Sequence, residues 1–478
     1  MKFKDIRDKL SSLKTVNNYF TVSAFILITL LNFGPGFSYD NPAALEQEIL
    51  RTLKISNAEY EILYITTSWP NVLFPIIGGY LLDRVIGYRL GTIIYTSCVL
   101  FGQALFILGC GFNMFWLMCV GRFFFGIGTE NTTVAQFTYA GRWFKGAQIS
   151  IVFGVIFTFT RLGSILDFNV TQALYFAILH RFQLNSNICL SLAYTLGFCL
   201  CTLSLIFAII LAVVDKKAEK YGTFNEKIDE KRTFRLSLKN FAFPFNMWLI
   251  FIIIICAYLV FPFITLAPVF FQTKYGYSSA LSSFTVSIFF ITVTIVSSIN
   301  GLIIDRTGKH LIWILIANVL VIVSHSIFAF TFLPPVLPAI ILGIGYSLAT
   351  TAVWALPTYI LSVNQLGTAY GCSLSALNLG EGIISVLSGV IVDNYGYLSL
   401  EVFFIFLNLI WLFWSIILFC SDYAKGGVLN KWGRSRRNKK DKEEKIESPI
   451  SFIDAPLLES EEPKFAQLEL ENSETQSI

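Results

Sequence analysis

Charged side chains inside long apolar stretches are the residues of this sequence with the clearest chemical potential. Glu130, Arg161 and Glu381 each lie in a run of mostly apolar residues that is long enough to cross a bilayer. A charge in the middle of a membrane is costly, so an ionisable residue there marks a functional site by default. A carboxylate can bind an amine, and a guanidinium offers a planar fork of donors that matches a carboxylate. These three residues are therefore the first candidates for binding a small charged solute.

Helical spacing groups these candidates with their neighbours. Residues three or four positions apart share a helix face, which places Thr133 beside Glu130. The same rule places Phe157 beside Arg161, whereas Asp167 lies off that face. We therefore include Thr133 among the candidate binding residues and interpret Asp167 as a structural partner.

Two further interpretations of the charged residues remain open. Glu130 and Arg161 could pair with each other and hold their bundle together, because buried charges usually find partners. This pair could also form in the empty site and separate when a substrate binds. Trp354 is an additional candidate for lining the cavity, although membrane tryptophans more often pack at interfaces.

The composition excludes soluble classes of protein. Hydrophobic residues make up 55% of the 478 residues and charged residues 14%, and the mean hydropathy is +0.66. A soluble domain is about 25% charged. The chain is therefore predicted to be a polytopic, all-α membrane protein, with lipid as its first partner. A net charge of only +4 gives no indication of nucleic-acid binding.

Twelve apolar segments are long enough to be membrane spans, since a span needs about 20 residues. The predicted spans are 18–38, 60–82, 91–112, 115–140, 150–179, 187–214, 246–271, 280–304, 311–332, 335–361, 368–392 and 399–420.

Lys and Arg predict the orientation of these spans. With the N-terminus inside, the inner segments before the C-terminal tail hold 19 basic residues and the outer loops hold four. Both termini and the linker are therefore predicted to be cytosolic. The predicted regions are a tail (1–17), a six-helix half (18–214), a linker (215–244), a second six-helix half (245–420) and a disordered tail (421–478).

An internal repeat relates the two halves. The sequence after the second span, 79–89, is similar to the sequence after the eighth span, 301–310. The aspartates of these loops, Asp83 and Asp305, are about 220 residues apart, and a Gly-Ile-Gly motif recurs at nearly the same separation. Two parallel six-helix halves of this kind resemble the major facilitator transporters.

The repeated loop also resembles the signature of that superfamily, G-x-x-x-D-R-x-G-R-K. Its glycines allow tight turns, and its aspartates can cap a helix start and pair with a nearby arginine. We predict that Asp83, Arg84, Asp305 and Arg306 form contacts that close the cytosolic side and break when it opens. Orientation signalling alone is the simpler alternative, but two copies at matched positions favour gating.

The repeat also relates two of the charged candidates. Arg161 and Glu381 are separated by about the repeat length, so we expect them at equivalent depths in symmetry-related helices. Substrates of this kind of transporter bind near the bilayer midplane, between the halves. We therefore predict that Arg161 and Glu381 face each other across the substrate cavity.

Several shorter stretches narrow the resemblance. They are Phe33–Gly36, Tyr39–Leu45, Ser68–Val72, Gly121–Phe123, Gly126–Gly128 and Trp143–Gly146. Together they resemble a family of lysosomal dipeptide transporters within the major facilitator superfamily. The resemblance implies facilitated export of dipeptides from the lysosome by alternating access, as a uniporter that requires no ion gradient.

The resemblance also implies a partner. In animals this family works with a glycosylated accessory subunit. The two glycosylation sequons of this chain, at Asn131 and Asn169, lie inside predicted spans, so the chain is predicted to be unglycosylated and a protective partner is expected.

The C-terminal tail carries a candidate sorting signal. Its first part is basic, which favours anionic lipid headgroups. Asp454 precedes the leucine pair Leu457 and Leu458, a pattern that resembles lysosomal sorting signals read by adaptor proteins. The pattern therefore predicts a sorting adaptor as a further partner and a lysosomal membrane location.

Two other functions remain as alternatives. Glu130 and Glu381 could carry protons in a proton-coupled carrier of another small organic solute. A transport-silent sensor that binds a solute and signals through its tails is a third reading, and the lack of a soluble tail domain counts against it. The sequence shows no nucleophile, metal cluster or phosphate loop above background, so we predict no enzyme activity, metal or cofactor.

Overall fold

The computed structural model describes residues 19–144, 148–221 and 242–430. Helices make up almost all of these three ranges, and no strand occurs within them. The predicted all-α fold is therefore confirmed for the described part of the chain.

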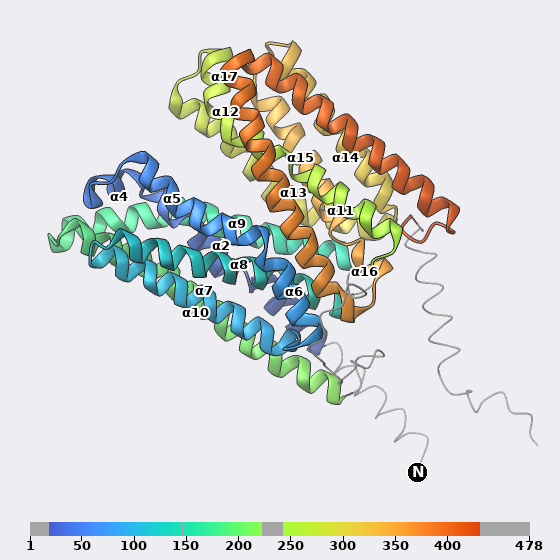
Figure 1. The fold of residues 1–478 in the computed structure, drawn as a ribbon, viewed down its shortest axis with the longest axis horizontal. Coiled ribbons are helices and arrows are strands. Elements are labelled where there is room, and N and C mark those ends of the chain that lie inside the picture. The colour runs from blue at the N-terminus through green and yellow to red at the C-terminus, as the bar shows by residue number, and fades with distance from the viewer. Residues whose placement is uncertain (1–18, 145–147, 222–241, 431–478) are drawn as a thin grey trace, which may run out of the picture. The chain divides into compact units, whose positions relative to one another are not determined.

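The first half begins with a helix over 19–30, which ends in a turn. The elements that follow are α2 (Phe33–Tyr39), α3 (Asn41–Ala44), α4 (Glu46–Leu53), α5 (Asn57–Ser68), the 3₁₀ helix η1 (Trp69–Val72), α6 (Phe74–Arg84), α7 (Gly87–Gly111), α8 (Phe115–Trp143), α9 (Ile149–Phe182) and α10 (Ser186–Lys220). Figure 1 labels most of them, and α7 lies against both α8 and α10.

The second half contains α11 (Phe245–Tyr258), α12 (Val260–Tyr275), α13 (Ser279–Thr307), α14 (His310–Phe330), α15 (Val336–Val353), α16 (Pro357–Ile360) and α17 (Val363–Ala424). We call the end of the helices where α10 ends and α11 begins the linker end. Within the second half, α14 packs against α15, and α11 packs against α17.

Nine helices of the described residues are long and apolar enough to cross a membrane. One of them, α17, bends at Gly396, which has a φ of 78°, and so contains the predicted spans 368–392 and 399–420. The charged helix α8 covers the fourth predicted span. The second predicted span is divided among α5, η1 and α6 because Pro70 and Pro75 interrupt the helical hydrogen bonds. The nine helices, of which α17 contains two spans, together with α8 and the segment from α5 to α6, account for all twelve predicted spans.

The helices extend further at the linker end than hydropathy predicts. Helix α10 continues to Lys220, past the predicted boundary at 214, because the buried Asp215 is neutralised inside the bundle. Its carboxylate accepts hydrogen bonds from Nε of Arg89 (2.6 Å) and Nε of Arg142 (3.2 Å). Similarly, α17 runs to Ala424, past the predicted start of the tail at 421.

Asp83 joins the two halves at the linker end. It lies in the last turn of α6, and its carboxylate accepts hydrogen bonds from the backbone N–H groups of Gly367 (3.0 Å) and Thr368 (2.6 Å). The Thr368 hydroxyl donates a third bond, at 2.7 Å. An acidic residue of the first half therefore binds backbone donors near the start of α17, where the helix dipole favours negative charge.

Asp305 makes the equivalent contact in the other direction. It lies near the end of α13, and its carboxylate accepts hydrogen bonds from the backbone N–H groups of Ser150 (3.1 Å) and Ile151 (2.8 Å) at the start of α9. Each aspartate of the repeated loop thus caps a helix of the opposite half. We call these two contacts the paired latches.

The arginines that follow the two aspartates form no close ion pair within the described residues. Among the described residues, no carboxylate lies within 4.0 Å of the side-chain nitrogens of Arg84 or Arg306. In this conformation the two carboxylates accept hydrogen bonds from backbone donors of the opposite half, and the gating role of these four residues stays a prediction. The glycines of the loops do have the predicted role: Gly87 (φ 73°) and Gly308 (φ 71°) provide left-handed turns.

Candidate functional site

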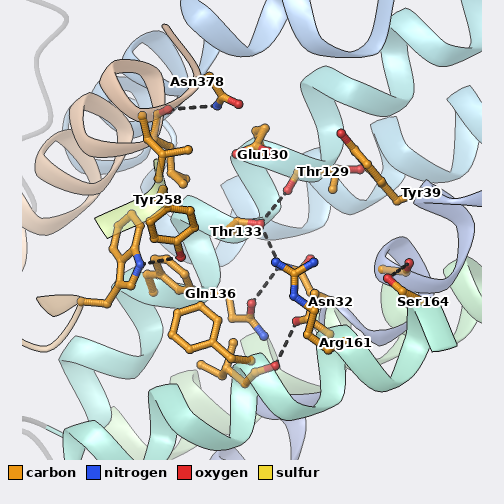
Figure 2. Close-up of a pocket in the computed structure, with 18 of the residues that line it drawn as sticks. Asn32, Tyr39, Thr129, Glu130, Thr133, Gln136, Arg161, Ser164, Tyr258 and Asn378 are labelled. Carbon is orange, nitrogen blue, oxygen red and sulfur yellow. Dashed lines mark hydrogen bonds between the residues drawn. The ribbon is translucent and has the colours of Figure 1, made fainter. Parts of the chain in front are cut away.

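A cavity of about 340 Å³ lies between the two halves. This volume falls in the range of small-molecule sites, about 300–1,000 Å³. Figure 2 shows lining side chains from the first half, including Glu130 and Arg161, and from the second half, including Tyr258 and Asn378. The complete lining is Asn32, Gly36, Tyr39, Asp40, Thr129, Glu130, Thr133, Gln136, Phe137, Ile156, Phe157, Thr160, Arg161, Ser164, Tyr258, Phe261, Tyr346, Trp354, Leu374, Leu377, Asn378 and Glu381.

All five residues predicted to bind substrate line this one cavity: Glu130, Thr133, Arg161, Trp354 and Glu381. They come from α8, α9 and α17, and from the C-cap of α15. Helical spacing and the internal repeat therefore identify residues that the fold brings together. Their role in binding stays a prediction, since no ligand is present.

The side chain of Arg161, on α9 of the first half, faces aromatic residues of the second half. Its guanidinium carbon is 5.1 Å from the centre of the Phe261 ring and 5.7 Å from that of Phe290. It also interacts electrostatically with Tyr258, Tyr346 and, more weakly, Asp40. Among the described carboxylates, none lies within 4.0 Å of the Arg161 nitrogens. The alternative in which Glu130 and Arg161 form a structural ion pair is therefore not realised in this conformation.

The cavity contains more carboxylates than the sequence analysis identified. Glu381 interacts electrostatically with both Glu130 and Arg161. Asp40 also lines the cavity and interacts with Arg161. The cavity thus combines one guanidinium with three carboxylates, an arrangement that can bind a solute carrying both a cation and an anion.

Asp40 was missed because it lies beyond the first predicted span. The polar sequence that begins at Tyr39 reads as a loop, but α2 ends there and α3 begins at Asn41 within the helical bundle. Buried Arg122 holds this break in place by donating to the carbonyl oxygens of Ser38 (3.2 Å) and Tyr39 (2.6 Å). A cation at the C-terminal end of a helix is stabilised by the helix dipole. The polar residues directly after the first span were the sequence signal for this site.

Thr133 belongs to a polar layer of the first half. The amide nitrogen of Asn32 donates to the Thr133 hydroxyl (2.9 Å) and to the side-chain oxygen of Gln136 (2.8 Å). Gln136 in turn donates to the carbonyl oxygen of Ile28, which the break in the first helix leaves accessible (2.6 Å). Figure 2 shows Asn32, Thr133 and Gln136 together beside the cavity. Thr133 therefore faces the cavity with a hydroxyl that is already hydrogen-bonded.

Trp354 forms part of an aromatic layer between the cavity and the linker end. Its ring is 4.9 Å from that of Phe137 across the two halves, and only 1% of its surface is exposed. Phe153 and Tyr370 complete the layer and are fully buried. Since its Nε1 donates to the Tyr258 hydroxyl (2.9 Å), Trp354 contributes mainly a closed apolar surface to the cavity.

Asp167 lies outside the cavity, as the spacing predicts. It is buried and accepts hydrogen bonds from the side chains of Asn41 and Thr171. Its contacts are with a polar network of the first bundle, so its role is structural.

Other predicted features are placed by the structure or lie beyond it. The sequons at Asn131 and Asn169 lie within α8 and α9, where both side chains donate to backbone carbonyl oxygens. The candidate sorting residues Asp454, Leu457 and Leu458 lie outside the described residues.

Comparison with known proteins places the chain in a family. The sequence profile described as Major Facilitator Superfamily matches residues 25–372. The human protein named lysosomal dipeptide transporter MFSD1 is 42% identical over 413 residues, which cover 86% of this chain and 88% of the relative. The zebrafish (Danio rerio) protein of that name is 39% identical, with the same coverage of both chains.

A solved structure supports the fold. The transporter FucP, crystallised in an outward conformation, superposes with a TM-score of 0.66 over 84% of this chain and 99% of its own, at 14% sequence identity. At this identity the likeness concerns the fold alone. On the profile match and the extensive identity to these relatives, the chain belongs to the Major Facilitator Superfamily and, within it, to the family of the MFSD1 proteins.

Proposed function

We propose that this protein is a lysosomal dipeptide uniporter that moves dipeptides from the lumen to the cytosol by alternating access. The relatives named above, which share about 40% of its residues, are called lysosomal dipeptide transporters. Dipeptides share one amine and one carboxylate, whatever their side chains. A carrier that accepts many of them must bind these two ends.

One observation carries the proposal: the cavity between the halves contains a guanidinium and several carboxylates that form no ion pair with any other described residue. In the proposed site, Arg161 binds the peptide carboxylate with its planar fork. Glu130, from the neighbouring helix of the same half, binds the amine, with Glu381 across the cavity as the alternative. The aromatic lining accommodates varied side chains.

The paired latches support alternating access. Asp83 and Asp305 each bind two backbone N–H groups of the opposite half, and these bonds must break for the linker end to open. Beyond them, the aromatic layer around Trp354 separates the cavity from that end. We infer that Asp83 and Asp305, with Arg84 and Arg306 beside them, gate the cytosolic side and that the structure represents the state closed to the cytosol.

Orientation and partners complete the proposal. The excess of basic residues at the linker end supports a cytosolic location for that end and for both termini. Single cysteines placed in 46–56 should then react with a reagent applied from the lumen, and those in 220–235 only from the cytosol. Labelling of 220–235 from the lumen would contradict this topology. An accessory subunit and an adaptor that reads Asp454, Leu457 and Leu458 are the proposed partners.

Uptake of labelled dipeptides into proteoliposomes tests the function. A uniporter should accumulate label only to equilibrium and should exchange it in counterflow, with no dependence on a pH gradient. Absence of both uptake and counterflow by folded protein would refute transport and favour a sensor.

A proton-coupled carrier is the second candidate, because three carboxylates face the cavity. A single zwitterionic substrate needs only one of them for its amine, which leaves acids that could take up a proton. Accumulation above equilibrium under an imposed pH gradient would establish this mechanism instead of uniport.

A further inference from the structure

The side chain of Arg161 extends from the first half onto aromatic residues of the second half. Besides Phe261 and Phe290, whose ring centres lie 5.1 and 5.7 Å from the guanidinium carbon, Tyr346 accepts a hydrogen bond from it, and Tyr258 lines the same cavity. These four residues belong to α12, α13, α11 and α15. We call them the cation cradle.

The cradle is itself firmly packed. The Phe261 and Tyr346 rings meet edge to face at 5.4 Å, and the Tyr258 and Tyr346 rings do so at 5.5 Å. Tyr258 also accepts a hydrogen bond from Nε1 of Trp354 at 2.9 Å. Because each ring is fixed by its neighbours, the cradle offers the guanidinium one defined position.

Aromatic rings hold Arg161 in a way that carboxylates would not. Asp40, Glu130 and Glu381 face the same cavity, and an ion pair with any of them would occupy the N–H donors of the guanidinium. A ring face attracts the cation through its quadrupole without accepting a full set of N–H bonds. Contact with the cradle therefore stabilises the charge and, apart from one hydrogen bond to the Tyr346 hydroxyl, leaves its fork of donors available.

We propose that the cation cradle determines the selectivity of the site for a free carboxylate terminus, by presenting the Arg161 fork to the substrate and keeping it off the three acids. This inference rests on the proposed function, in which Arg161 binds that terminus. The cradle residues are positioning residues, since they act through Arg161. Because they belong to the second half, recognition of the carboxylate depends on both halves.

A comparison of two substrates tests the cradle. The measurement is kcat/KM for a dipeptide with a free carboxylate, divided by kcat/KM for its C-terminal amide, in the same proteoliposome preparation. Phe261→Leu, which keeps apolar volume but removes the ring, should lower this ratio about fivefold through a higher KM for the free dipeptide. Phe261→Tyr, which keeps the ring, should preserve the ratio.

A matched control lies on the same helix as Arg161. Phe157 also lines the cavity, but its ring packs against Phe137 and Phe153. Phe157→Leu removes as much aromatic surface and should leave the substrate ratio at the wild-type value, whatever it does to the overall rate. Since both substrates are measured with one preparation, the amount of folded protein cancels from the ratio.

The outcomes separate the cradle from the proposed function. If Phe261→Leu and Phe290→Leu both keep the wild-type ratio while Arg161→Ala abolishes the discrimination, the cradle is overturned and the proposed function stands. If Arg161→Ala itself keeps the ratio, Arg161 does not bind the carboxylate and the proposed function fails. Should Phe261→Leu not fold, Phe290→Leu makes the same test, with the same expected fall in the ratio.

Discussion

At the linker end, Asp83 of the first half caps α17 and Asp305 of the second half caps α9, each through two backbone N–H groups. In the cavity, the corresponding positions differ: Arg161 in the first half matches Glu381 in the second at about the repeat length. The halves thus close alike but differ in the cavity, where the guanidinium comes from the first half alone.

A second difference concerns Glu130. Its counterpart by the repeat, Ser347, does not line the cavity, and its hydroxyl is bonded to the side chains of Ser297 and Asn300. Equal contacts suit a motion in which the two halves separate symmetrically at the linker end, whereas a solute with unlike ends requires unlike charged groups in the cavity. The comparison therefore assigns the symmetric residues to movement and the asymmetric residues to recognition.

The largest expected effect on transport comes from removing the guanidinium of Arg161, which has no counterpart in the second half. Arg161→Ala should reduce dipeptide transport at least about 100-fold, because the substrate carboxylate loses its charge-assisted hydrogen bonds. Arg161→Lys should restore only part of it, since an ammonium is a point charge and not a planar fork. Uptake into proteoliposomes is the measurement, with monodisperse elution as the folding control. Normal transport by folded Arg161→Ala would make the charge structural.

A larger side chain at the close contacts between the halves near the linker end should lower turnover by a smaller factor, which should be similar for the two halves. A Cβ on Gly79 would lie 2.1 Å from the Gly367 carbonyl oxygen, and one on Gly154 would lie 2.4 Å from that of Ser297. Gly79→Ala and Gly154→Ala should each lower turnover about tenfold, because the halves cannot close fully at the linker end.

Gly389 provides the matched control for these two variants. It lies in the same long helix as Gly367, and a Cβ there meets nothing within 4 Å. Gly389→Ala should transport normally. If it were as impaired as Gly79→Ala, the loss would come from helix conformation and not from closure between the halves.

The paired latches should give the smallest change. Asp83→Asn and Asp305→Asn each keep the shape of the side chain but weaken its charge-assisted bonds, which shifts the conformational equilibrium and not the binding site. We expect turnover to fall about three- to fivefold, with KM little changed and with similar values for the two variants. A strong loss of affinity at normal turnover would exclude a gating role.

Much of the fold follows from the sequence because membrane spans are long and the repeat is evident. Hydropathy located the twelve spans, but it ended α10 too early at Asp215, since a carboxylate counts as polar whether or not Arg89 and Arg142 neutralise it. The broken helix around Asp40 was missed because its polar residues read as a loop, although Arg122 stabilises the break inside the bundle. Linear patterns record the type of a residue but not the partner that stabilises it.

The candidate site was predictable to the extent that charge alone identifies it. Glu130, Arg161 and Glu381 were found because charges are rare within spans, and the repeat related two of them. The cation cradle has no such signal, since Phe261 and Phe290 are two of 46 phenylalanines in the sequence. Only the packing of the two halves distinguishes them.

The most direct test of the central claim, that the cavity binds the two ends of a dipeptide with opposite charges, crosses variants with blocked substrates. Glu130→Gln should transport free dipeptides at least about tenfold less efficiently than the wild type. When the peptide amine is acetylated, the variant should transport the peptide as efficiently as the wild type does or better, because neither the substituted side chain nor the blocked amine then carries a charge. Glu381→Gln, measured in parallel, shows which acid binds the amine. If transport by both acid variants were impaired equally for free and acetylated peptides, neither carboxylate would bind the amine, and the account would be contradicted.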